Sequence, residues 1–351
     1  MLFALICCSV LMLVSVLIWL AVVFHPARAW DFQPVAEDVP APPPPEAWPP
    51  VCILVPARNE SETLPRTLPA LLGQEYAGPL RVVLVDDRST DGTAEVARRL
   101  GREAGAEGRL SVLEGQPLPD GWVGKVWALE QGRRHAAGLG AKYLLLTDAD
   151  ILHARHSLKR LVAESEAAEL ALNSRMALLR CQSGAERLLI PAFVFFFNLL
   201  YPMRWVNDPR HALAASAGGC VLLNAEALAA AGGLETIRGA IIDDVSLARA
   251  VKAPGRPLRL ALSRNDVVSL RAYDDLDSVW SMVRRTAFTE LGYSWLKLLG
   301  CIGMLAILFV LPRWRWPAAR CWRSRWPAEY GTPSISPGRS GSRRRAWSRG
   351  D

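Results

Sequence analysis

Residues 51–60 read VCILVPARNE, in which a short apolar run is followed by a polar turn. Two more apolar runs, Arg81–Val85 and Lys142–Thr147, have the length and composition that are typical of buried strands. Amphipathic segments between the runs predict three helices: Glu62–Leu72, Asp91–Leu100 and Lys125–Ala137. Strands that alternate with helices predict an α/β domain with a mostly parallel sheet and helices on both of its faces.

Residues that directly follow the predicted strands are the first candidates for chemistry, because open α/β sheets bind ligands beyond the carboxyl ends of their strands. Pro56, Asn59 and Glu60 follow the first strand and could face a bound nucleotide, although any strand–helix turn carries polar residues. Asp86 and Asp87 follow the second strand, and their carboxylates could accept hydrogen bonds from a base or from ribose hydroxyls. One such acid would fit a helix-capping turn, whereas two in succession favour a binding site.

The third strand ends in TDAD at residues 147–150, which brings the carboxylates of Asp148 and Asp150 close together. Carboxylate oxygens are ligands for Mg²⁺ or Mn²⁺, and such an ion keeps coordination places for phosphate oxygens. We therefore predict a metal that holds a diphosphate, although D-x-D by itself is a common pattern. His153 and His156 are expected on the following loop and helix; if one of them reached the metal, Mn²⁺ would be favoured.

A second acidic pair, Asp243 and Asp244, follows two isoleucines at the head of a predicted helix. Acids at this position stabilise a helix through its dipole. In a transfer reaction the same carboxylates can act as a general base, which removes the proton of an acceptor hydroxyl as that hydroxyl attacks. Both interpretations stay open at this point.

The charge and cysteine content argue against two classes of protein. The chain carries a net charge of +7, but residues 313–351 hold ten arginines against Glu329 and Asp351, so this tail carries +8 and the rest of the chain −1. A body without net positive charge is not typical of a nucleic-acid-binding domain. The seven cysteines are scattered and form no C-x-x-C pair, which argues against a disulfide framework or a zinc knuckle.

An uncharged run, Leu2–Phe24, is long enough to cross a hydrocarbon core of about 30 Å at about 1.5 Å per residue. A cleaved signal peptide is the alternative, because Ala27-Arg28-Ala29 resembles a cleavage site. However, no basic residue precedes the run, so we expect a transmembrane anchor at residues 1–25. Arg28 follows the run, and the positive-inside rule then places the next domain in the cytoplasm, at a bacterial-type inner membrane.

The rest of the chain divides by composition. Residues 26–50, which include PAPPPPEAWPP, predict a proline-rich linker, and residues 51–291 form the α/β domain. Within this domain, the apolar segment 188–203 is expected to be an interfacial or channel-lining helix, with core packing as the alternative. Residues 292–312 predict a membrane-associated or transmembrane helix. Residues 313–351 form a basic tail rich in Arg, Trp and Ser, interpreted as disordered or read in a shifted frame.

Together, these motifs resemble the inverting family 2 glycosyltransferases with a GT-A fold. They occur in the order of that family: VPARNE, DDRSTDGT, a lysine in GKVWAL, TDAD, AGGC and the acidic pair in IIDDVSLA. The resemblance covers about residues 51–291, and the joint order and spacing are far more specific than any single motif. Within the family, the anchor, the GWVGKVWAL stretch and the apolar middle segment look most like the hopanoid-associated membrane glycosyltransferases.

The resemblance implies donor-side roles for five residues. Asp87, together with Asp86, would contact the nucleoside base or ribose. Lys125 would lie near the nucleotide or the diphosphate. Asp148 would touch the ribose, and both acids of the D-x-D motif are candidate ligands of Mg²⁺ or Mn²⁺, with Asp150 as the main one.

On the acceptor side, the resemblance implies that Gly218 and Gly219 border the acceptor, where a small residue lets the substrate approach. Asp244 matches the second acid of the Glu-Asp pair of the family and is the predicted base. Asp243 replaces the usual Glu, so the choice between the two acids stays open.

A basic motif, Gln/Arg-x-x-Arg-Trp, follows the acidic pair in processive and ceramide-type relatives. Here the corresponding stretch is MVRRT at residues 282–286. The resemblance implies that Arg285 keeps a pyrophosphate-facing role, while Thr286 stands in place of the Trp. This difference disfavours a processive polysaccharide synthase.

The function that these features favour is a metal-dependent, inverting transfer of a sugar from a nucleotide-sugar to a membrane lipid, with a hopanoid-related lipid as one candidate. Two alternatives stay open. One is a non-catalytic membrane protein with a degenerate transferase fold, and the other is a processive polysaccharide synthase. No nucleic-acid partner is expected.

Overall fold

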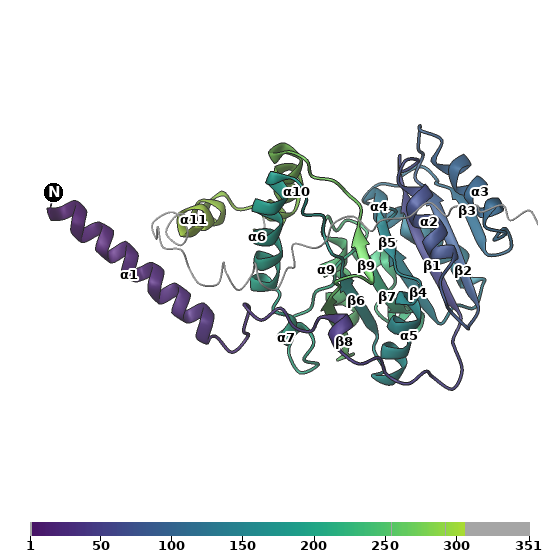
Figure 1. Cartoon of the computed structure of the whole chain (residues 1–351), viewed down its shortest axis with the longest axis horizontal. Helices are drawn as coiled ribbons and strands as arrows, with labels where there is room; N and C mark the ends of the chain where they lie inside the picture. The colour runs from purple at the N-terminus through teal and green to yellow at the C-terminus, as the bar shows by residue number, and fades with distance from the viewer. Residues whose placement is uncertain (1, 254, 292, 306–351) are drawn as a thin grey trace, which may run out of the picture. The chain divides into compact units, whose positions relative to one another are not determined.

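A seven-stranded sheet lies at the centre of the chain, with its strands in the order β3-β2-β1-β4-β7-β6-β8 (Figure 1). β7 runs antiparallel to both of its neighbours, and the other adjacent pairs are parallel. The strands are β1 (Val51–Ala57), β2 (Leu80–Asp86), β3 (Leu110–Glu114), β4 (Tyr143–Thr147), β6 (Leu172–Met176), β7 (Cys220–Asn224) and β8 (Leu258–Leu262). A separate ribbon pairs β5 (Ile151–His153) with β9 (Val267–Ser269) in antiparallel fashion.

The computed structural model describes residues 2–253, 255–291 and 293–305. The chain falls into two units. Val16–Ile302 contains the sheet, the ribbon and the helices packed on them, and the second unit consists of Met1–Ser15 and Gly303–Asp351. The predicted tail at residues 313–351 lies outside the described residues.

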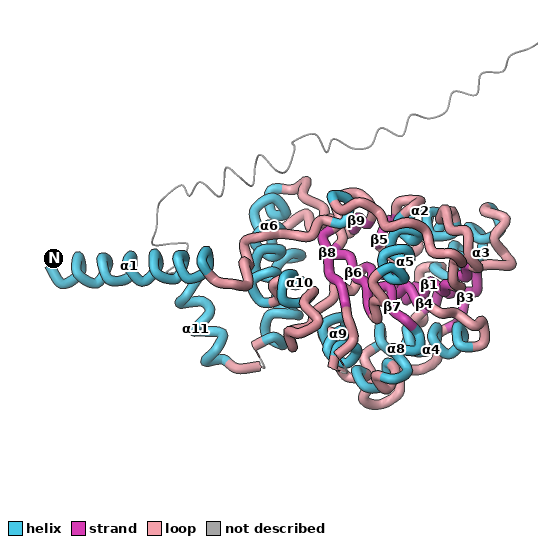
Figure 2. The backbone as a smooth tube through the Cα atoms, turned by 90° about the horizontal axis from the view of Figure 1, so that it is seen from below, coloured by secondary structure: helices cyan, strands magenta, loops and turns pink. Residues whose placement is uncertain are grey.

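Helices cover both faces of the sheet, as the tube view shows (Figure 2). Successive strand residues point to opposite faces, so Ile53 and Leu54 of β1 belong to different apolar clusters. The helices that contribute to the cluster of Leu54 include α4 (Gly124–Ala137), α8 (Ala225–Ala230) and α9 (Asp243–Lys252). Those that contribute to the cluster of Ile53 are α2 (Leu64–Leu72), α3 (Thr93–Glu103) and α5 (Ser157–Ala167).

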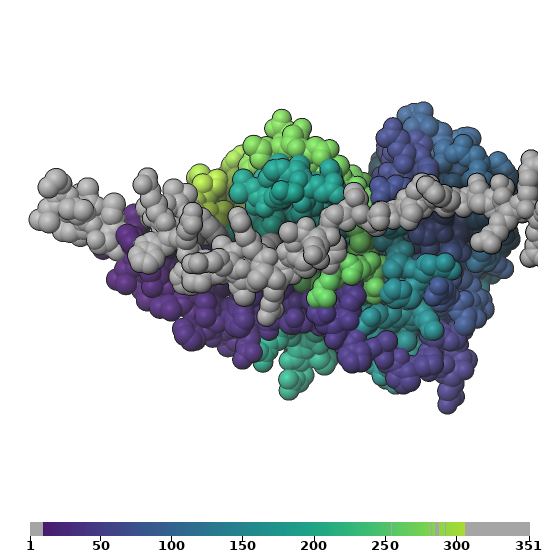
Figure 3. All heavy atoms as spheres, in the orientation of Figure 1, coloured from purple at the N-terminus to yellow at the C-terminus, as the bar shows by residue number. Residues whose placement is uncertain are grey.

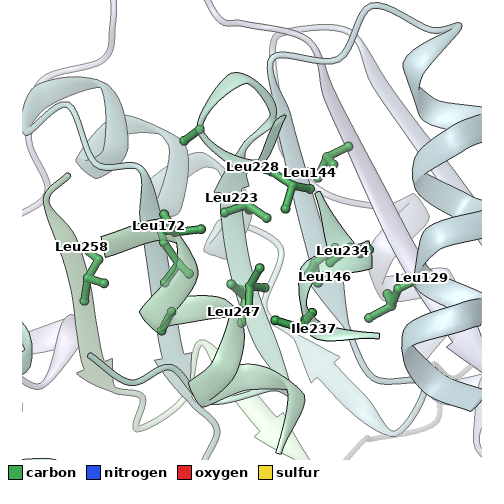
Figure 4. Close-up of a cluster of buried hydrophobic side chains, with 14 of the residues drawn as sticks. Leu129, Leu144, Leu146, Leu172, Leu223, Leu228, Leu234, Ile237, Leu247 and Leu258 are labelled. Atoms are coloured by element: carbon green, nitrogen blue, oxygen red, sulfur yellow. The ribbon is translucent and has the colours of Figure 1, made fainter. Parts of the chain in front are cut away.

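The cluster on the Leu54 side fixes two helices that carry predicted site residues. Figure 4 shows Leu129 of α4 and Leu247 of α9 among leucines such as Leu146 of β4. A fully buried leucine contributes about 1.5–3 kcal/mol relative to an exposed one. The N-termini of α4 and α9, where Lys125 and the Asp243–Asp244 pair lie, are therefore held against the sheet.

The predicted α/β class, the three strands and the three helices are confirmed, with differences at their ends. β1 continues through Pro56 to Ala57, two residues beyond the predicted strand, so Pro56 lies within a strand and not in the following turn. α2 begins at Leu64, with Pro65 in its first turn, where the missing N–H of proline leaves no helical hydrogen bond unmade.

The first half of the predicted linker is not a free spacer. The 3₁₀ helix η1 (Ala36–Asp38) docks beside β8, where Val35 bridges Leu262. The Glu37 carboxylate accepts hydrogen bonds from the backbone N–H groups of Arg264, Asn265 and Asp266 at 2.8–2.9 Å. The spacer character predicted for residues 26–50 therefore fits only residues 40–47, which have no regular structure, because Trp48 packs against Tyr76 and the Tyr76 hydroxyl donates to the carbonyl oxygen of Pro49.

The apolar segment 188–203 forms most of α6 (Gly184–Leu200) and reaches the start of α7 (Met203–Val206). Ile190 and Asn198 are buried, whereas Leu188 and Leu200 are exposed, so this segment is partly core and partly surface. α6 packs against α10 (Leu276–Glu290), and the two adjoin in the space-filling view (Figure 3).

α1 (Leu2–Phe24) forms over the run predicted as an anchor, and α11 (Trp295–Leu305) over part of the predicted membrane segment at residues 292–312. Within the described residues, however, the structure contains no helix that is both long enough and apolar enough to cross a bilayer. The transmembrane predictions for residues 1–25 and 292–312 are therefore not supported. Residues 306–312 lie outside the described part of the chain.

Candidate active site

Two loops at one edge of the sheet are joined by hydrogen bonds. β1 and β2 are parallel, so the loops that follow them meet at the same edge. The backbone N–H of Asn59 donates to the Ser89 hydroxyl at 2.9 Å, and the Asn59 side-chain oxygen accepts from the N–H of Thr90 at 2.9 Å. Asn59 and Arg88 both have a left-handed φ, of 55° and 57°, which non-glycine residues keep only where their surroundings hold them. The two loops are therefore held in one conformation.

Asp87 faces this edge, whereas Asp86 is used by the turn. The Asp86 carboxylate accepts a hydrogen bond from the backbone N–H of Ser89 at 3.2 Å. Asp87 lies 3.5 Å from the Arg58 guanidinium, and burial raises the pKa of the Asp87 carboxyl while Arg58 opposes this rise. A Cβ on Gly124 would lie 3.3 Å from Asp87 Oδ2, so the glycine lets the start of α4 approach this carboxylate.

Lys125 connects the two acidic pairs that the sequence singled out. Its Nζ lies 2.8 Å from Asp148 Oδ1 and 3.4 Å from Asp243 Oδ2. Burial alone would lower the pKa of Lys125, but Asp148, Asp243 and Asp244 outweigh this and raise that pKa above its ordinary value. The lysine is therefore a fixed positive charge between the end of β4 and the start of α9.

Asp244 is held by backbone donors. Its Oδ2 accepts from the N–H of Gly218 at 2.9 Å, and its Oδ1 accepts from the N–H of Val245 at 2.8 Å. Burial, followed by the negative charge of Asp243, raises the pKa of Asp244 to about 6, although Lys125 and the two N–H donors oppose the rise. The two backbone donors therefore fix the orientation of the Asp244 carboxylate, and its pKa lies closer to neutral pH than that of an ordinary aspartate.

The two predicted glycines have different surroundings. A Cβ on Gly218 would lie 3.2 Å from Lys125 Nζ and 3.4 Å from Asp244 Oδ2, so Gly218 belongs to the charged cluster. A Cβ on Gly219 would lie 3.0 Å from Ile151 Cδ1, so Gly219 is packed against β5.

Asp150 pairs with a residue that the sequence reasoning missed. Arg271 donates from Nε to Asp150 Oδ2 at 2.8 Å, and its other end lies 3.3 Å from Glu60 Oε1. Burial raises the pKa of the Glu60 carboxyl, and the charges of Asp150 and Asp148 add to this rise against that of Arg271. Arg271 follows β9, a strand of three residues that is too short to give a periodic signal in the sequence.

The two histidines are engaged away from the acidic pairs. His153 is buried in β5 and shares hydrogen bonds with the hydroxyls of Thr147 and Ser157, and burial lowers its pKa to about 4. His156 pairs with Asp266 at 2.9 Å. The alternative in which a histidine reaches the metal therefore has no support in this geometry. Arg285 belongs to α10, and its side chain lies outside what the structure describes.

The chemistry of the donor atoms fits a divalent cation that is shared with a ligand. Asp148 and Asp150 each have a protein cation against their carboxylate, Lys125 and Arg271, so this edge of the sheet already holds two positive charges. Among the described residues, no group of three or more His, Cys, Asp or Glu side chains is arranged to hold a metal. Two carboxylates that are completed by phosphate oxygens match the way in which Mg²⁺ is usually bound.

Residues 52–209 match the family model described as glycosyl transferase family 2. This similarity supports the predicted family over 158 of the 351 residues, a little less than half of the chain.

Two relatives that are named for an activity are each 28% identical to this chain over part of its length. The chain is 28% identical over 216 residues to the 4,4'-diaponeurosporenoate glycosyltransferase of Staphylococcus aureus, which is 59% of this chain and 52% of that protein. It is also 28% identical over 113 residues to the enzyme of the same name from Staphylococcus haemolyticus, which is 32% of this chain and 27% of that protein. The chain thus spans about half the length, or less, of these relatives.

A solved structure supports the fold. The mannosyltransferase PcManGT from Pyrobaculum calidifontis, solved in complex with GDP-Man and Mn²⁺, matches with a TM-score of 0.54 and 21% sequence identity. The match covers 91% of this chain and 89% of that one. The predicted GT-A fold is thereby confirmed for the α/β domain.

Proposed function

We propose that this protein transfers a sugar from a nucleotide-sugar donor to a lipid acceptor, with inversion at the sugar carbon and with the help of a divalent cation. One observation carries the proposal: Lys125 forms ion pairs with Asp148, which directly follows β4, and with Asp243, which begins α9. One acidic pair is suited to the donor diphosphate and the other to the acceptor hydroxyl, and a transferase needs both at one place.

The donor side of the proposal uses the loops after β1, β2 and β4. Asp87 lies at the edge of the sheet where the loops after β1 and β2 meet, and its side chain is 16% exposed. Its carboxylate would accept hydrogen bonds from the base or the ribose. Asp148 and Asp150 would hold Mg²⁺ or Mn²⁺, which neutralises the charge that develops on the leaving diphosphate. Arg271 is close enough to Asp150 and Glu60 to pair with phosphate oxygens that arrive there. The presence of GDP-Man and Mn²⁺ in the PcManGT structure supports this assignment.

On the acceptor side, we assign the general base to Asp244. Its pKa of about 6 leaves it ionised at neutral pH and still basic enough to take a proton. The acceptor oxygen would attack the anomeric carbon as its proton passes to Asp244, and the bond to the diphosphate would break on the opposite face. This single displacement inverts the configuration at that carbon.

The nature of the acceptor is proposed from the relatives and from the exposed apolar helices. The staphylococcal relatives are named for a carotenoid lipid, 4,4'-diaponeurosporenoate. Leu188 and Leu200 of α6 and Trp280 of α10 expose apolar surface that suits a lipid. A hopanoid is a second candidate within the same class. We further propose that the domain works on the cytoplasmic side of a bacterial inner membrane, because Arg28 follows the uncharged run of α1.

Replacement of the proposed base is the most direct test. We expect Asp244→Asn to lower transfer by about 10²–10⁴-fold, the usual contribution of a general base, while donor binding stays within a few-fold of wild type. Transfer is measured by mass spectrometry of lipid products with a panel of nucleotide-sugars and with carotenoid and hopanoid acceptors. Donor binding is measured by calorimetry with Mn²⁺ present. Asp208→Asn is the matched control, because Asp208 pairs with the exposed Arg210.

The outcomes separate the competing functions. Wild-type turnover in Asp244→Asn would remove that residue from the role of base. Failure of the wild-type chain to bind any donor would favour the non-catalytic alternative. Long polymeric products would favour a processive synthase.

A further inference from the structure

A basic hollow of about 500 Å³ lies where α1 ends, away from the acidic pairs of the site. It is lined by Phe24, His25, Arg28 and Trp30 from the chain that leaves α1, and by Arg204 of α7. The proposed sugar transfer uses none of these residues.

The hollow is built by specific contacts. Asn198 of α6 is buried and donates to the carbonyl oxygen of Ala29 at 2.7 Å, which ties the segment after α1 to the domain. The Trp30 indole N–H donates to the carbonyl oxygen of Val23 at 2.8 Å. Arg28 has a left-handed φ of 47°, and its backbone N–H closes the turn by donating to the carbonyl oxygen of His25 at 2.9 Å. These contacts hold the turn that presents the Arg28 side chain.

The charge of the hollow is uncompensated. Its lining contains two arginines and no acid, and in the described part of the chain neither guanidinium forms an ion pair. Arg210, on the loop after α7, differs because its guanidinium lies 3.1 Å from the Asp208 carboxylate. Arg28 and Arg204 are thus free to bind an anion, and a guanidinium matches the geometry of a phosphate.

An exposed apolar surface leads to this hollow along α1. Val16, Leu17 and Leu20 are 45–55% exposed, and Phe24 at the rim of the hollow is 79% exposed. Trp30 beside it is 45% exposed and combines an apolar ring with a polar N–H, as side chains at bilayer interfaces do. A ligand that matches both surfaces has an anionic phosphate joined to hydrocarbon chains.

We propose that the hollow at the end of α1 binds the headgroup of an anionic phospholipid, with the phosphate between Arg28 and Arg204 and the acyl chains along the exposed side of α1. This site is distinct from the site of sugar transfer and does not depend on the proposed function. Inorganic phosphate carries the same anionic group but has no hydrocarbon chain to contact the apolar side of α1. A phospholipid should therefore bind more tightly than inorganic phosphate, and the two affinities distinguish these ligands.

The test uses the full chain in a neutral detergent and measures binding by calorimetry. The probes are dihexanoyl-phosphatidylglycerol, dihexanoyl-phosphatidylcholine and inorganic phosphate. We expect phosphatidylglycerol to bind at least about tenfold more tightly than either of the other two. The double variant Arg28→Gln/Arg204→Gln should lose this preference, and Arg210→Gln, the matched control, should keep it. An unchanged unfolding temperature shows that each variant is folded.

Each outcome decides the question. A preference for phosphatidylglycerol that only the double variant loses supports the proposal. Equal affinity for the anionic and the zwitterionic lipid overturns it, as does an equal loss in Arg210→Gln. Inorganic phosphate that binds as tightly as phosphatidylglycerol would overturn the lipid assignment and make the hollow a phosphate site.

Discussion

At the scale of the residue, the neighbours of Asp244 set its proton affinity. Burial comes first and the adjacent charge of Asp243 second, and together they raise the pKa of Asp244 to about 6. A carboxyl with a raised pKa is protonated up to that pH and ionised above it. A base with this pKa therefore becomes active as the pH rises through about 6.

We predict that kcat/KM falls tenfold per pH unit below about pH 6 and is level above it. Asp243→Asn removes the neighbouring negative charge, so it should lower the pKa of Asp244 and move this acid limb to lower pH. The measurement is the pH profile of kcat/KM for both proteins. Loss of all activity in Asp243→Asn would identify Asp243 as the base, and an unmoved limb would show that the two carboxylates do not interact.

At the residue scale, the position of a candidate side chain could be predicted where it directly follows an apolar strand or begins a helix. Asp148 and Asp150 follow β4, and Asp243 and Asp244 begin α9, as the apolar runs before them indicated, whereas the roles of these acids stay predictions. Arg271 was missed because the strand before it, β9, has three residues, too few to show a period.

At the scale of the element, η1 shows how one carboxylate can attach a segment to the domain. Burial alone would raise the pKa of Glu37, but backbone N–H donors from Asn265, Asp266 and Arg264 outweigh this and lower that pKa to about 2. A lowered pKa means that the ionised form stabilises the folded state. This stabilisation is complete above the ordinary value of about 4.5 and is lost as the pH falls toward about 2.

We therefore expect Glu37→Gln to lower the free energy of unfolding by about 1.5–3 kcal/mol at neutral pH, the range for hydrogen bonds to a charged group. This corresponds to a shift of a few degrees in the unfolding temperature. The difference from wild type should shrink between pH 4.5 and 2. Asp38→Asn is the control, because Asp38 pairs with Arg264 on an exposed surface, where ion pairs contribute about 0–1 kcal/mol. A pH-independent difference would show that the charge of Glu37 is not what matters.

Element-scale prediction found the strands β1, β2 and β4 and the helices α2, α3 and α4, but not the docked segment. Apolar runs such as Val51–Val55 carry their own signal, because they are buried on both faces. The attachment of η1 depends on the backbone N–H groups of a distant loop, at residues 264–266, and no composition pattern reports such a contact. The strand β7 itself was not predicted, and its antiparallel direction depends on the connections and not on the strand.

At the scale of the whole molecule, cationic side chains of the chain itself neutralise the acids of the site when no ligand is bound. Lys125 lies against Asp148 and Arg271 against Asp150, so two parts of the chain far apart in sequence supply the cations. A divalent cation alone must compete with these charges, whereas a nucleoside diphosphate brings negative charge that the freed lysine and arginine can bind. Metal and nucleotide should therefore bind together more strongly than either binds alone.

We predict that Mn²⁺ with a nucleoside diphosphate raises the unfolding temperature by more than the sum of the shifts that each produces alone. A ligand at about 100 times its Kd stabilises by about 2.7 kcal/mol, so the effect is measurable in a thermal melt. Arg271→Met should strengthen the binding of Mn²⁺ alone, because it frees Asp150, and should weaken the joint effect, because the diphosphate loses a partner. Asp150→Asn should abolish the joint effect, and excess chelator should remove both this effect and transfer. Additive shifts, or full transfer in chelator, would contradict a metal at this pair of acids.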